Sequence, residues 1–246
     1  MRKILFLLSP LFISITCFAQ DSAQQKSDSL LSVIAHSKED TNLVHLLLDA
    51  SQKNADLNPA QSIAFGKQAL ELSTKLKWKE GTMRSHQALA EEYWKTEDWA
   101  EAIGSIQEVI DLADIHTPKT QLFNFYNALG SAYTFLEIYP NARESFQKAL
   151  EICKEINDEE HYNIVIGNLA WVDYNLGNYR EALENGKKNL ESSLRYNNKN
   201  DIANCYCVGG LIYEKLNRPD SAIDFFNKAV EMSEYIDPAF LSAALN

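Results

Sequence analysis

Apolar residues recur three and four positions apart along most of this chain, which is the spacing of an amphipathic helix. Glycine and proline are scarce, whereas Ala, Leu, Glu and Lys are frequent, a composition that favours helix over strand. The pattern predicts a leading helix at about 22–37, with Leu30, Leu31 and Ile34 as its apolar stripe, and a last helix that starts near Pro238. Between them it predicts antiparallel helix pairs at about 41–55 and 59–76, 80–95 and 99–114, 119–136 and 139–156, 159–176 and 179–196, and 199–216 and 219–235.

The helix pairs form an internal repeat of forty residues. Small residues stand in the first helix of each copy at Ala50, Ala90, Gly130, Ala170 and Gly210. Three positions further on, the chain has Lys53, Tyr93, Tyr133, Asp173 and Tyr213. The second helices carry Ser62, Ala102, Ala142, Ala182 and Ala222, and then Ala69, Val109, Ala149, Asn189 and Ala229. Small side chains let two helices approach closely, and a single pair cannot bury its apolar faces alone, so the copies are expected to stack.

Turn residues mark the ends of the predicted helices. Proline falls in or near the first turn of the second helix at Pro59, Pro140 and Pro219, where its missing N–H costs no hydrogen bond. Predicted N-caps are Asn58, Asp98 and Asn178, and Gly177 suits the turn before Asn178.

The segments NALGSAYTFLEIYPNARESFQKALEI and GNLAWVDYNLGNYREALENGKKNLE resemble tetratricopeptide repeats, and the resemblance covers about residues 41–246. It implies an all-α fold, a right-handed α-solenoid of stacked antiparallel helix pairs. The repeats would cover about 41–78, 79–117, 118–157, 158–197 and 198–236, with a partial sixth at 237–246. The forty-residue spacing resembles the longer variety of this repeat. Departures from the family pattern occur at Asp49 and Lys53 in the first copy, and at Asp173, Gly186 and Asn189 in the fourth.

The N-terminus has the layout of a secretory signal peptide. A basic start, MRK, precedes the apolar run ILFLLSPLFISIT and the small residue Ala19, which predicts a signal peptide at 1–19 and a mature chain from Gln20. Lipidation at Cys17 is a less favoured alternative. The three residues before it, Ser14–Thr16, fit poorly the apolar-then-small pattern expected before a lipidated cysteine. No later apolar stretch is long enough to span a bilayer, so the mature chain is expected outside the cytoplasm of a bacterium, with residues 20–40 as a leader that contains the capping helix.

A signal peptide, a short leader and a long-repeat array together resemble the extracytoplasmic part of membrane-bound bacterial sensor histidine kinases. In such proteins a membrane span and signalling domains follow the repeats. The next small-residue position would fall four residues beyond Asn246, which favours a fragment of a longer protein, and any kinase activity would lie in that further region.

No catalytic or cofactor motif stands out. The five histidines show no metal-ligand spacing, and there is no Gly-rich phosphate loop, GxSxG or HExxH, so we expect neither an enzyme, a cofactor nor a metal site. Cys153, Cys205 and Cys207 are expected to be buried small apolar residues. The formal charge of −11 becomes −13 once Arg2 and Lys3 are removed, and such an acidic chain argues against nucleic acid as a partner.

The remaining candidate is a binding surface, because stacked first helices line the concave face in the family that the chain resembles. The residues predicted there are Arg84, Gln87, Glu91, Trp94, Asn124, Asn127, Ser131, Asn168, Trp171 and Tyr174. Such side chains can hydrogen-bond an extended peptide and clamp its side chains, which predicts a protein or peptide partner. Two alternatives stay open: Trp94 and Trp171 pack between repeats, or they are stacking platforms for a small molecule or glycan. The basic clamp that some family members use is absent, since Arg84 is the single base in this set.

Overall fold

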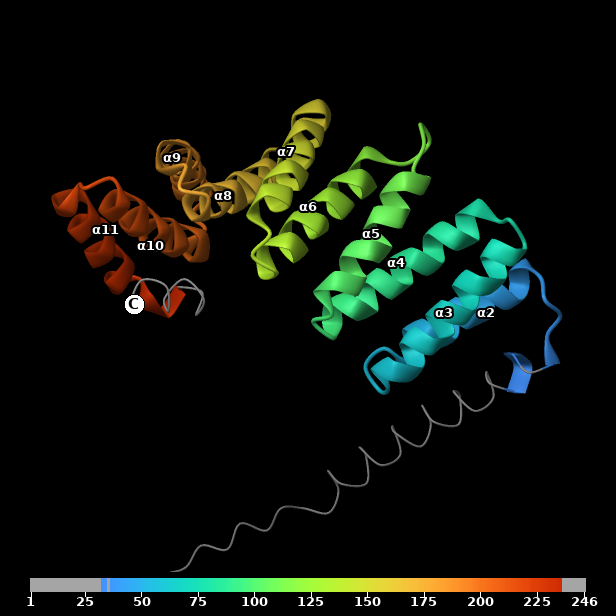
Figure 1. Ribbon diagram of the computed structural model, residues 1–246. Helices are drawn as coiled ribbons and strands as arrows, with labels where there is room; N and C mark the ends of the chain where they lie inside the picture. Colours follow the sequence, from blue (N-terminus) through green and yellow to red (C-terminus); the bar gives the residue numbers. More distant parts are fainter. Residues whose placement is uncertain (1–31, 35, 236–246) are drawn as a thin grey trace, which may run out of the picture. The chain divides into compact units, whose positions relative to one another are not determined.

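A computed structural model of the protein describes residues 32–34 and 36–235, and within those ranges its regular secondary structure is helical (Figure 1). The helices are α2 (Thr41–Asn54), α3 (Pro59–Lys75), α4 (Lys79–Lys95), α5 (Trp99–Leu112), α6 (Lys119–Phe135), α7 (Tyr139–Ile156), α8 (Glu159–Asn175), α9 (Tyr179–Tyr196), α10 (Lys199–Lys215), α11 (Pro219–Glu231) and the 3-10 helix η1 (Ser233–Tyr235). All five predicted pairs are present, with bounds that agree to within four residues. The predicted signal peptide, most of the leading helix and the last helix near Pro238 lie outside the described residues.

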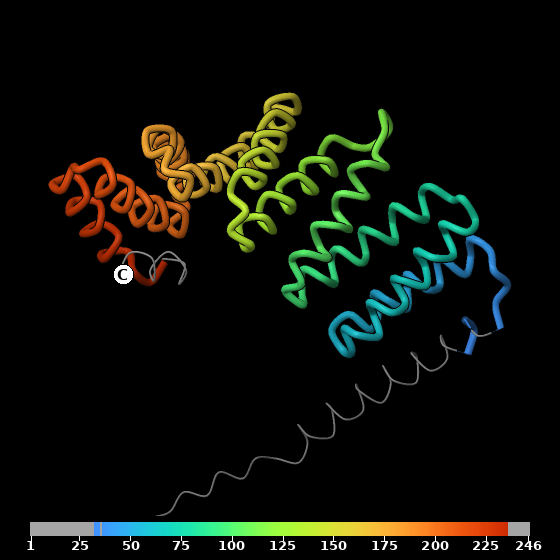
Figure 2. Tube along the Cα trace, viewed as in Figure 1, coloured from blue at the N-terminus to red at the C-terminus, as the bar shows by residue number. Residues whose placement is uncertain are grey.

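The chain divides into two compact units, Met1–Val109 and Ile110–Asn246, and the division falls inside α5. In the first unit α3 packs against α2 and α4. In the second unit each helix from α6 to α11 packs against the next one along the chain. Figure 2 follows the backbone through the short turns that reverse its direction between successive helices. Each unit is therefore a stack of antiparallel helix pairs, as the repeat predicts.

The predicted small residues are buried where paired helices touch. In the second helices Ser62, Ala102, Ala142, Ala182 and Ala222 are all buried. In the first helices a Cβ added to Gly130 would lie 2.7 Å from the ring of Phe146, and one added to Gly210 would lie 2.5 Å from Phe226. These distances are too short for a methyl group, so glycine is what lets each aromatic ring rest against the facing helix. The packing role predicted for these positions is confirmed.

The predicted N-cap residues Asn58 and Asn178 stand at the starts of their helices, but only Asn58 makes a side-chain capping hydrogen bond. The side chain of Asn58 accepts a hydrogen bond from the backbone N–H of Gln61, and Pro59 opens α3. Pro140 and Pro219 likewise lie in the first turn of their helices. Asn178 precedes α9, but its side chain makes no capping hydrogen bond. Its carboxamide instead points toward the buried carboxylate of Asp173, at 3.4 Å.

Several helices end in a residue with left-handed backbone geometry. Gly177 has φ of +80°, as its predicted place in a turn requires. Non-glycine residues with positive φ are Lys77, Glu97, Glu137, Asn157, Asn197 and Asn217. In the turns after α3, α4, α6 and α10 the backbone N–H three residues beyond the helix end donates to a carbonyl in the last turn of the helix. Asp98 N, for example, donates to Tyr93 O at 2.8 Å.

Departures from the family pattern have local structural compensation. Lys53 and Asp49 form an ion pair of 2.6 Å on the surface of α2. Ser62, which replaces the alanine of the other copies, donates to the backbone carbonyl of Ser51 at 2.7 Å, and the Ser51 hydroxyl donates to the Ser62 carbonyl at 2.9 Å. These reciprocal bonds satisfy two buried hydroxyl groups and fix α2 against α3.

Candidate functional site

In the first unit a polar groove of about 670 Å³ runs between α2 and α4. Three of the predicted site residues, Arg84, Gln87 and Glu91, line it. They share one face of α4 because they lie three and four residues apart. His45, Asp49, Gln52 and Asp56 line the groove on the side of α2 and the turn after it, and Glu92 and Lys95 complete the side of α4.

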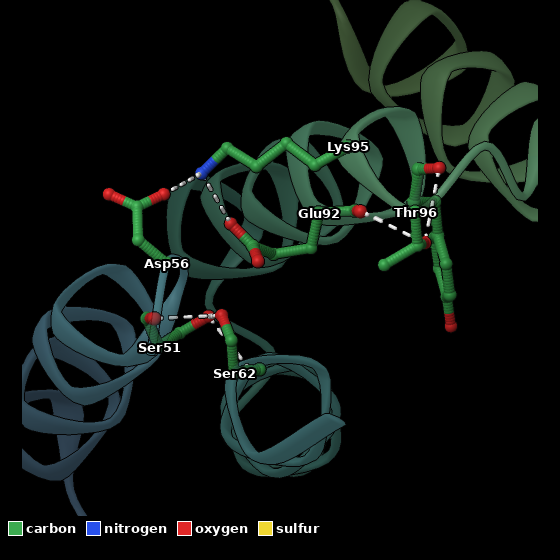
Figure 3. A network of polar contacts seen from close by, with 7 residues as sticks. Ser51, Asp56, Ser62, Glu92, Lys95 and Thr96 are labelled. Carbon is green, nitrogen blue, oxygen red and sulfur yellow. Dashed lines mark hydrogen bonds and ion pairs between the residues drawn. The ribbon is translucent and has the colours of Figure 1, made fainter. Parts of the chain in front are cut away.

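A buried carboxylate lies in the wall of this groove (Figure 3). Glu92 is only 4% exposed, and its Oε1 accepts a hydrogen bond from Lys95 Nζ at 3.1 Å. Lys95 Nζ also lies 4.0 Å from Asp56 Oδ1, so the ammonium group bridges two carboxylates. The hydrogen bond from Lys95 to Glu92 raises the pKa of the lysine, with partial burial acting against it. Among the described residues no donor reaches Glu92 Oε2.

Trp94 does not line the groove. Its ring meets that of Trp99 edge to face, with centroids 5.0 Å apart, inside its own helix pair. Contacts of this kind stabilise the turn between the two helices. The structure therefore places Trp94 in a packing contact, with part of its surface still accessible.

In the second unit the first helix of the third repeat carries Asn124, Asn127 and Ser131. Asn124 is exposed, and Asn127 and Ser131 are half-buried. The Ser131 hydroxyl donates to the backbone carbonyl of Asn127 at 3.0 Å. No donor in the described chain reaches the buried Oδ1 atom of Asn127. The three side chains lie on one helix face and offer donors and acceptors there.

A smaller cavity, of about 130 Å³, lies among α8, α9 and α10 and includes the predicted residue Asn168. Its lining combines carboxamides and one carboxylate with small and apolar residues: Ile164, Gly167, Asn168, Ala170, Gly186, Asn189, Asp201, Asn204, Cys205, Val208 and Gly209. A Cβ on Gly167 would lie 2.5 Å from Asn189 Nδ2, so this glycine makes room for the carboxamide. Burial raises the pKa of Asp201. Gly186 and Asn189, two departures from the family pattern, thus border a hollow that larger packing residues would fill.

Trp171 and Tyr174 lie next to one another on α8. Their rings stack with centroids 5.6 Å apart and 20° between their planes. Both pack against the cluster of Ala182, Val208 and Ile212, which joins α8 and α9 to α10. Packing between neighbouring repeats is therefore what the structure shows for Trp171.

The comparisons agree with this geometry. The family model described as tetratricopeptide repeat matches residues 121–191 and, in a second overlapping match, residues 163–234. The two matches together span residues 121–234, and this part of the chain is similar to tetratricopeptide repeats. The described helices that precede residue 121 share this fold by comparison with solved structures that are 16–18% identical to the chain.

Three solved structures illustrate that fold. The protein BtubC (BKLC) from P. vanneervenii is 16% identical with a TM-score of 0.66, over 87% of this chain and 89% of that one. YrrB, described as a tetratricopeptide repeat protein with an unusual peptide-binding site, is 18% identical with a TM-score of 0.63, over 89% of this chain and 97% of its own. A signal-transduction ATPase with numerous domains and a tetratricopeptide repeat sensor, from Pyrococcus horikoshii, is 16% identical with a TM-score of 0.70; the match covers 90% of this chain but 35% of that protein.

Aligning the tetratricopeptide repeats shows which site residues the sequence reasoning missed. Glu92 occupies a position where later copies have Ala132, Val172 and Ile212, so an acid among apolar residues was the available signal. Asn204 stands in the same position as Arg84 and Asn124, and the repeat spacing alone could have added it to the predicted set.

The cysteines of the tetratricopeptide array are buried, as predicted. Burial raises the pKa of Cys153 to about 11, of Cys205 to about 12 and of Cys207 to about 11. Thiols of this kind stay protonated at neutral pH and are poor nucleophiles. The described residues contain no group of three or more His, Cys, Asp or Glu side chains placed to hold a metal ion. Within the same ranges no helix is both long and apolar enough to cross a membrane.

Proposed function

We propose that this chain is a non-enzymatic interaction module that binds an extended peptide segment of another protein along the first helices of its repeats. The observation that carries the proposal is the groove between α2 and α4, which has a volume of about 670 Å³ and is lined mostly by polar side chains. Tetratricopeptide proteins in general mediate protein and peptide interactions, and YrrB is described as having a peptide-binding site. A peptide backbone needs donors and acceptors at intervals, which these side chains provide.

The cavity bordered by Asn168 supports the same function in the second unit. Its carboxamides can pair with backbone or side-chain groups of a peptide, and its volume of about 130 Å³ admits a small side chain. A hollow that accepts one anchoring side chain beside hydrogen-bonding groups is a common basis of peptide specificity.

Selection from a displayed library of random twelve-residue peptides tests the proposal. Selected peptides are expected to lose affinity, measured by fluorescence anisotropy, when Gln87→Ala or Asn168→Ala is introduced. Lys187→Ala is the control, because Lys187 is exposed on a second helix. Recovery of no binding peptide, or equal binding to all three variants, would contradict the assignment.

A glycan or small-molecule receptor is the second candidate. It needs an open aromatic face, whereas the Trp171 ring stacks on Tyr174 and the Trp94 ring packs against Trp99. A titration of tryptophan fluorescence with cell-wall oligosaccharides separates the two functions, since a saturable response would favour the receptor.

The biological setting that we propose is the extracytoplasmic sensing or scaffolding part of a bacterial signalling protein, with the long variety of tetratricopeptide repeat across 41–246. Supporting this proposal are the signal-peptide pattern at 1–19, the leader at 20–40 and the forty-residue spacing. The Pyrococcus horikoshii protein, which has a repeat sensor, offers a parallel for sensing.

Export is tested by expressing the chain in a bacterial host and determining the N-terminus of the product. Cleavage before Gln20 is the expected result. A lipid-modified N-terminal Cys17 would instead establish the alternative processing, and an uncleaved cytoplasmic product would contradict export.

A further inference from the structure

The groove between α2 and α4 has a marked excess of negative charge. Four carboxylates line it, from Asp49, Asp56, Glu91 and Glu92, against two cationic side chains, Arg84 and Lys95. Two of the acids already have partners on the protein, since Asp49 pairs with Lys53 and Glu91 accepts a bond from Gln87. Asp56 is almost fully exposed and faces Lys95 from 4.0 Å.

Glu92 is the exception among these acids, because it is buried and incompletely paired. A carboxylate can accept about four hydrogen bonds, yet the described residues give Glu92 a single donor, Lys95, and leave Oε2 with none. A buried acceptor without a partner is unfavourable, and more so when it is charged. The Oε2 atom of Glu92 can therefore accept a hydrogen bond from a ligand that enters the groove.

In the unbound protein Lys95 occupies the place that a donor from a ligand would take at Glu92. Its ammonium group lies between Asp56 and Glu92, as Figure 3 shows, but nearly half of its side chain is exposed. An arginine that takes the place of Lys95 keeps the buried Glu92 carboxylate paired, so the exchange leaves no uncompensated buried charge. A guanidinium group carries five donors in a planar fork and can engage both oxygens of one carboxylate. The last torsion of a glutamate side chain is broad, which allows the carboxylate to turn toward such a partner.

We propose that the groove between α2 and α4 takes a basic peptide segment, and that an arginine of this segment replaces Lys95 at Glu92 and Asp56. This inference rests on the proposed peptide-binding function and adds the chemistry of the partner. Arg84, at the other end of the α4 lining, repels further bases and so favours a segment with one well-placed arginine over a uniformly basic one.

Three labelled peptides of equal length and spacing test the proposal on the full chain: one with a single central arginine, one with citrulline there and one with glutamate. Citrulline keeps the shape of arginine and removes its charge. The arginine peptide is expected to bind at least about tenfold more tightly than the citrulline peptide, and its affinity is expected to fall with added salt.

Two variants with opposite expected effects separate ligand binding from a structural role. Glu92→Gln is expected to weaken the arginine peptide about tenfold, because the buried charge is lost. Lys95→Ala is expected to strengthen it, because the competing ammonium group is removed. Glu101→Gln on the exposed surface of α5 is the control and should leave the affinity unchanged.

The outcomes also distinguish this inference from the proposed function. Equal binding of the arginine and citrulline peptides, unaffected by Glu92→Gln, would overturn the basic-peptide inference and leave peptide binding in place. A weaker affinity in Lys95→Ala would overturn the exchange of Lys95 for a ligand arginine. If none of the three labelled peptides binds, and the displayed library also yields no binding peptide, both the basic-peptide inference and the proposed peptide-binding function would be overturned.

Discussion

Arg143 on α7 donates from its Nε to the Oδ1 of Asp173 on α8 at 2.7 Å, and so links the third repeat to the fourth. Asp173 is 1% exposed and stands where the second, third and fifth repeats have a tyrosine. Its second oxygen accepts from Asn185 Nδ2 at 3.2 Å. The fourth repeat thus replaces an apolar contact with a charge-assisted network, in which every oxygen of the buried carboxylate has a donor.

Removing the arginine from this network is expected to destabilise the second unit. Arg143→Ala leaves the Asp173 carboxylate buried with only carboxamide donors. Arg143 is one-third exposed, which makes the pair weaker than a fully buried one, so we expect a loss of about 2 kcal/mol in the free energy of unfolding. Urea unfolding followed by circular dichroism measures it. Glu144→Ala, which breaks the exposed pair with Lys148, is the control and should stay within about 0.5 kcal/mol.

The double variant Arg143→Leu with Asp173→Tyr is expected to recover most of that loss. Tyr93 and Tyr213 are buried at the equivalent position in their repeats, so a tyrosine side chain can occupy this position between two paired helices. A double variant as unstable as Arg143→Ala would show that the surrounding packing has adapted to the ion pair.

His86 on α4 is expected to make stability depend on pH. Burial lowers its pKa, with the charge of Glu108 acting in the opposite direction. A depressed pKa in the folded state means that stability is complete above the unfolded value of about 6.5 and is lost as pH falls through the folded value. His86→Gln should flatten the decline in unfolding free energy below about pH 6.5, as measured by urea unfolding at a series of pH values.

Two glycines are expected to respond to alanine in opposite ways. Gly177 has φ of +80°, so Gly177→Ala should cost about 1 kcal/mol. Gly104 lies inside α5 with nothing within 4 Å of an added Cβ, so Gly104→Ala should stabilise the protein by about 0.5 to 1 kcal/mol. Melting temperatures of the two variants provide the comparison, and a shift in the same direction for both would contradict this account.

The thiols of Cys153, Cys205 and Cys207 are expected to resist alkylation in the native protein. Burial both blocks access and raises their pKa values to about 11, 12 and 11. Because these folded values lie above the unfolded pKa near 9, their contribution to stability is full below about pH 9 and declines as pH rises toward the folded values. Mass spectrometry after iodoacetamide treatment should find these sites modified only in denaturant; rapid native labelling would show that the helices open locally.

The fold could be predicted largely from the sequence because packing in a repeat array is local and recurs at one spacing. Most positions that face the partner helix carry the same kind of residue in most copies, as Ala102, Ala142 and Ala182 do, so the repeat itself indicates their packing role. Capping was less predictable. Asn178 has the right residue type for an N-cap, but the carboxylate of Asp173, five residues earlier, attracts its side chain.

The site was harder to predict because it depends on exceptions to the repeat. Glu92 is buried by the groove wall and paired with Lys95, a relationship that helical periodicity does not contain. Trp94 and Trp171 lie near the predicted surface, yet their rings pack against neighbouring aromatic residues. Periodicity assigns a residue to a face of its helix, whereas contacts with other helices determine which atoms remain available.

The left-handed residues at the helix ends have a practical consequence. Lys77, Glu97 and Glu137 keep a geometry that glycine would adopt more easily, so the packed helices on either side determine the bend and the turn residue follows it. A cysteine placed at Glu97 or Glu137 should therefore accept a fluorophore or a surface linker without changing the path of the chain. With Cys153, Cys205 and Cys207 buried, such a site would give an attachment point that is not among the residues lining the groove.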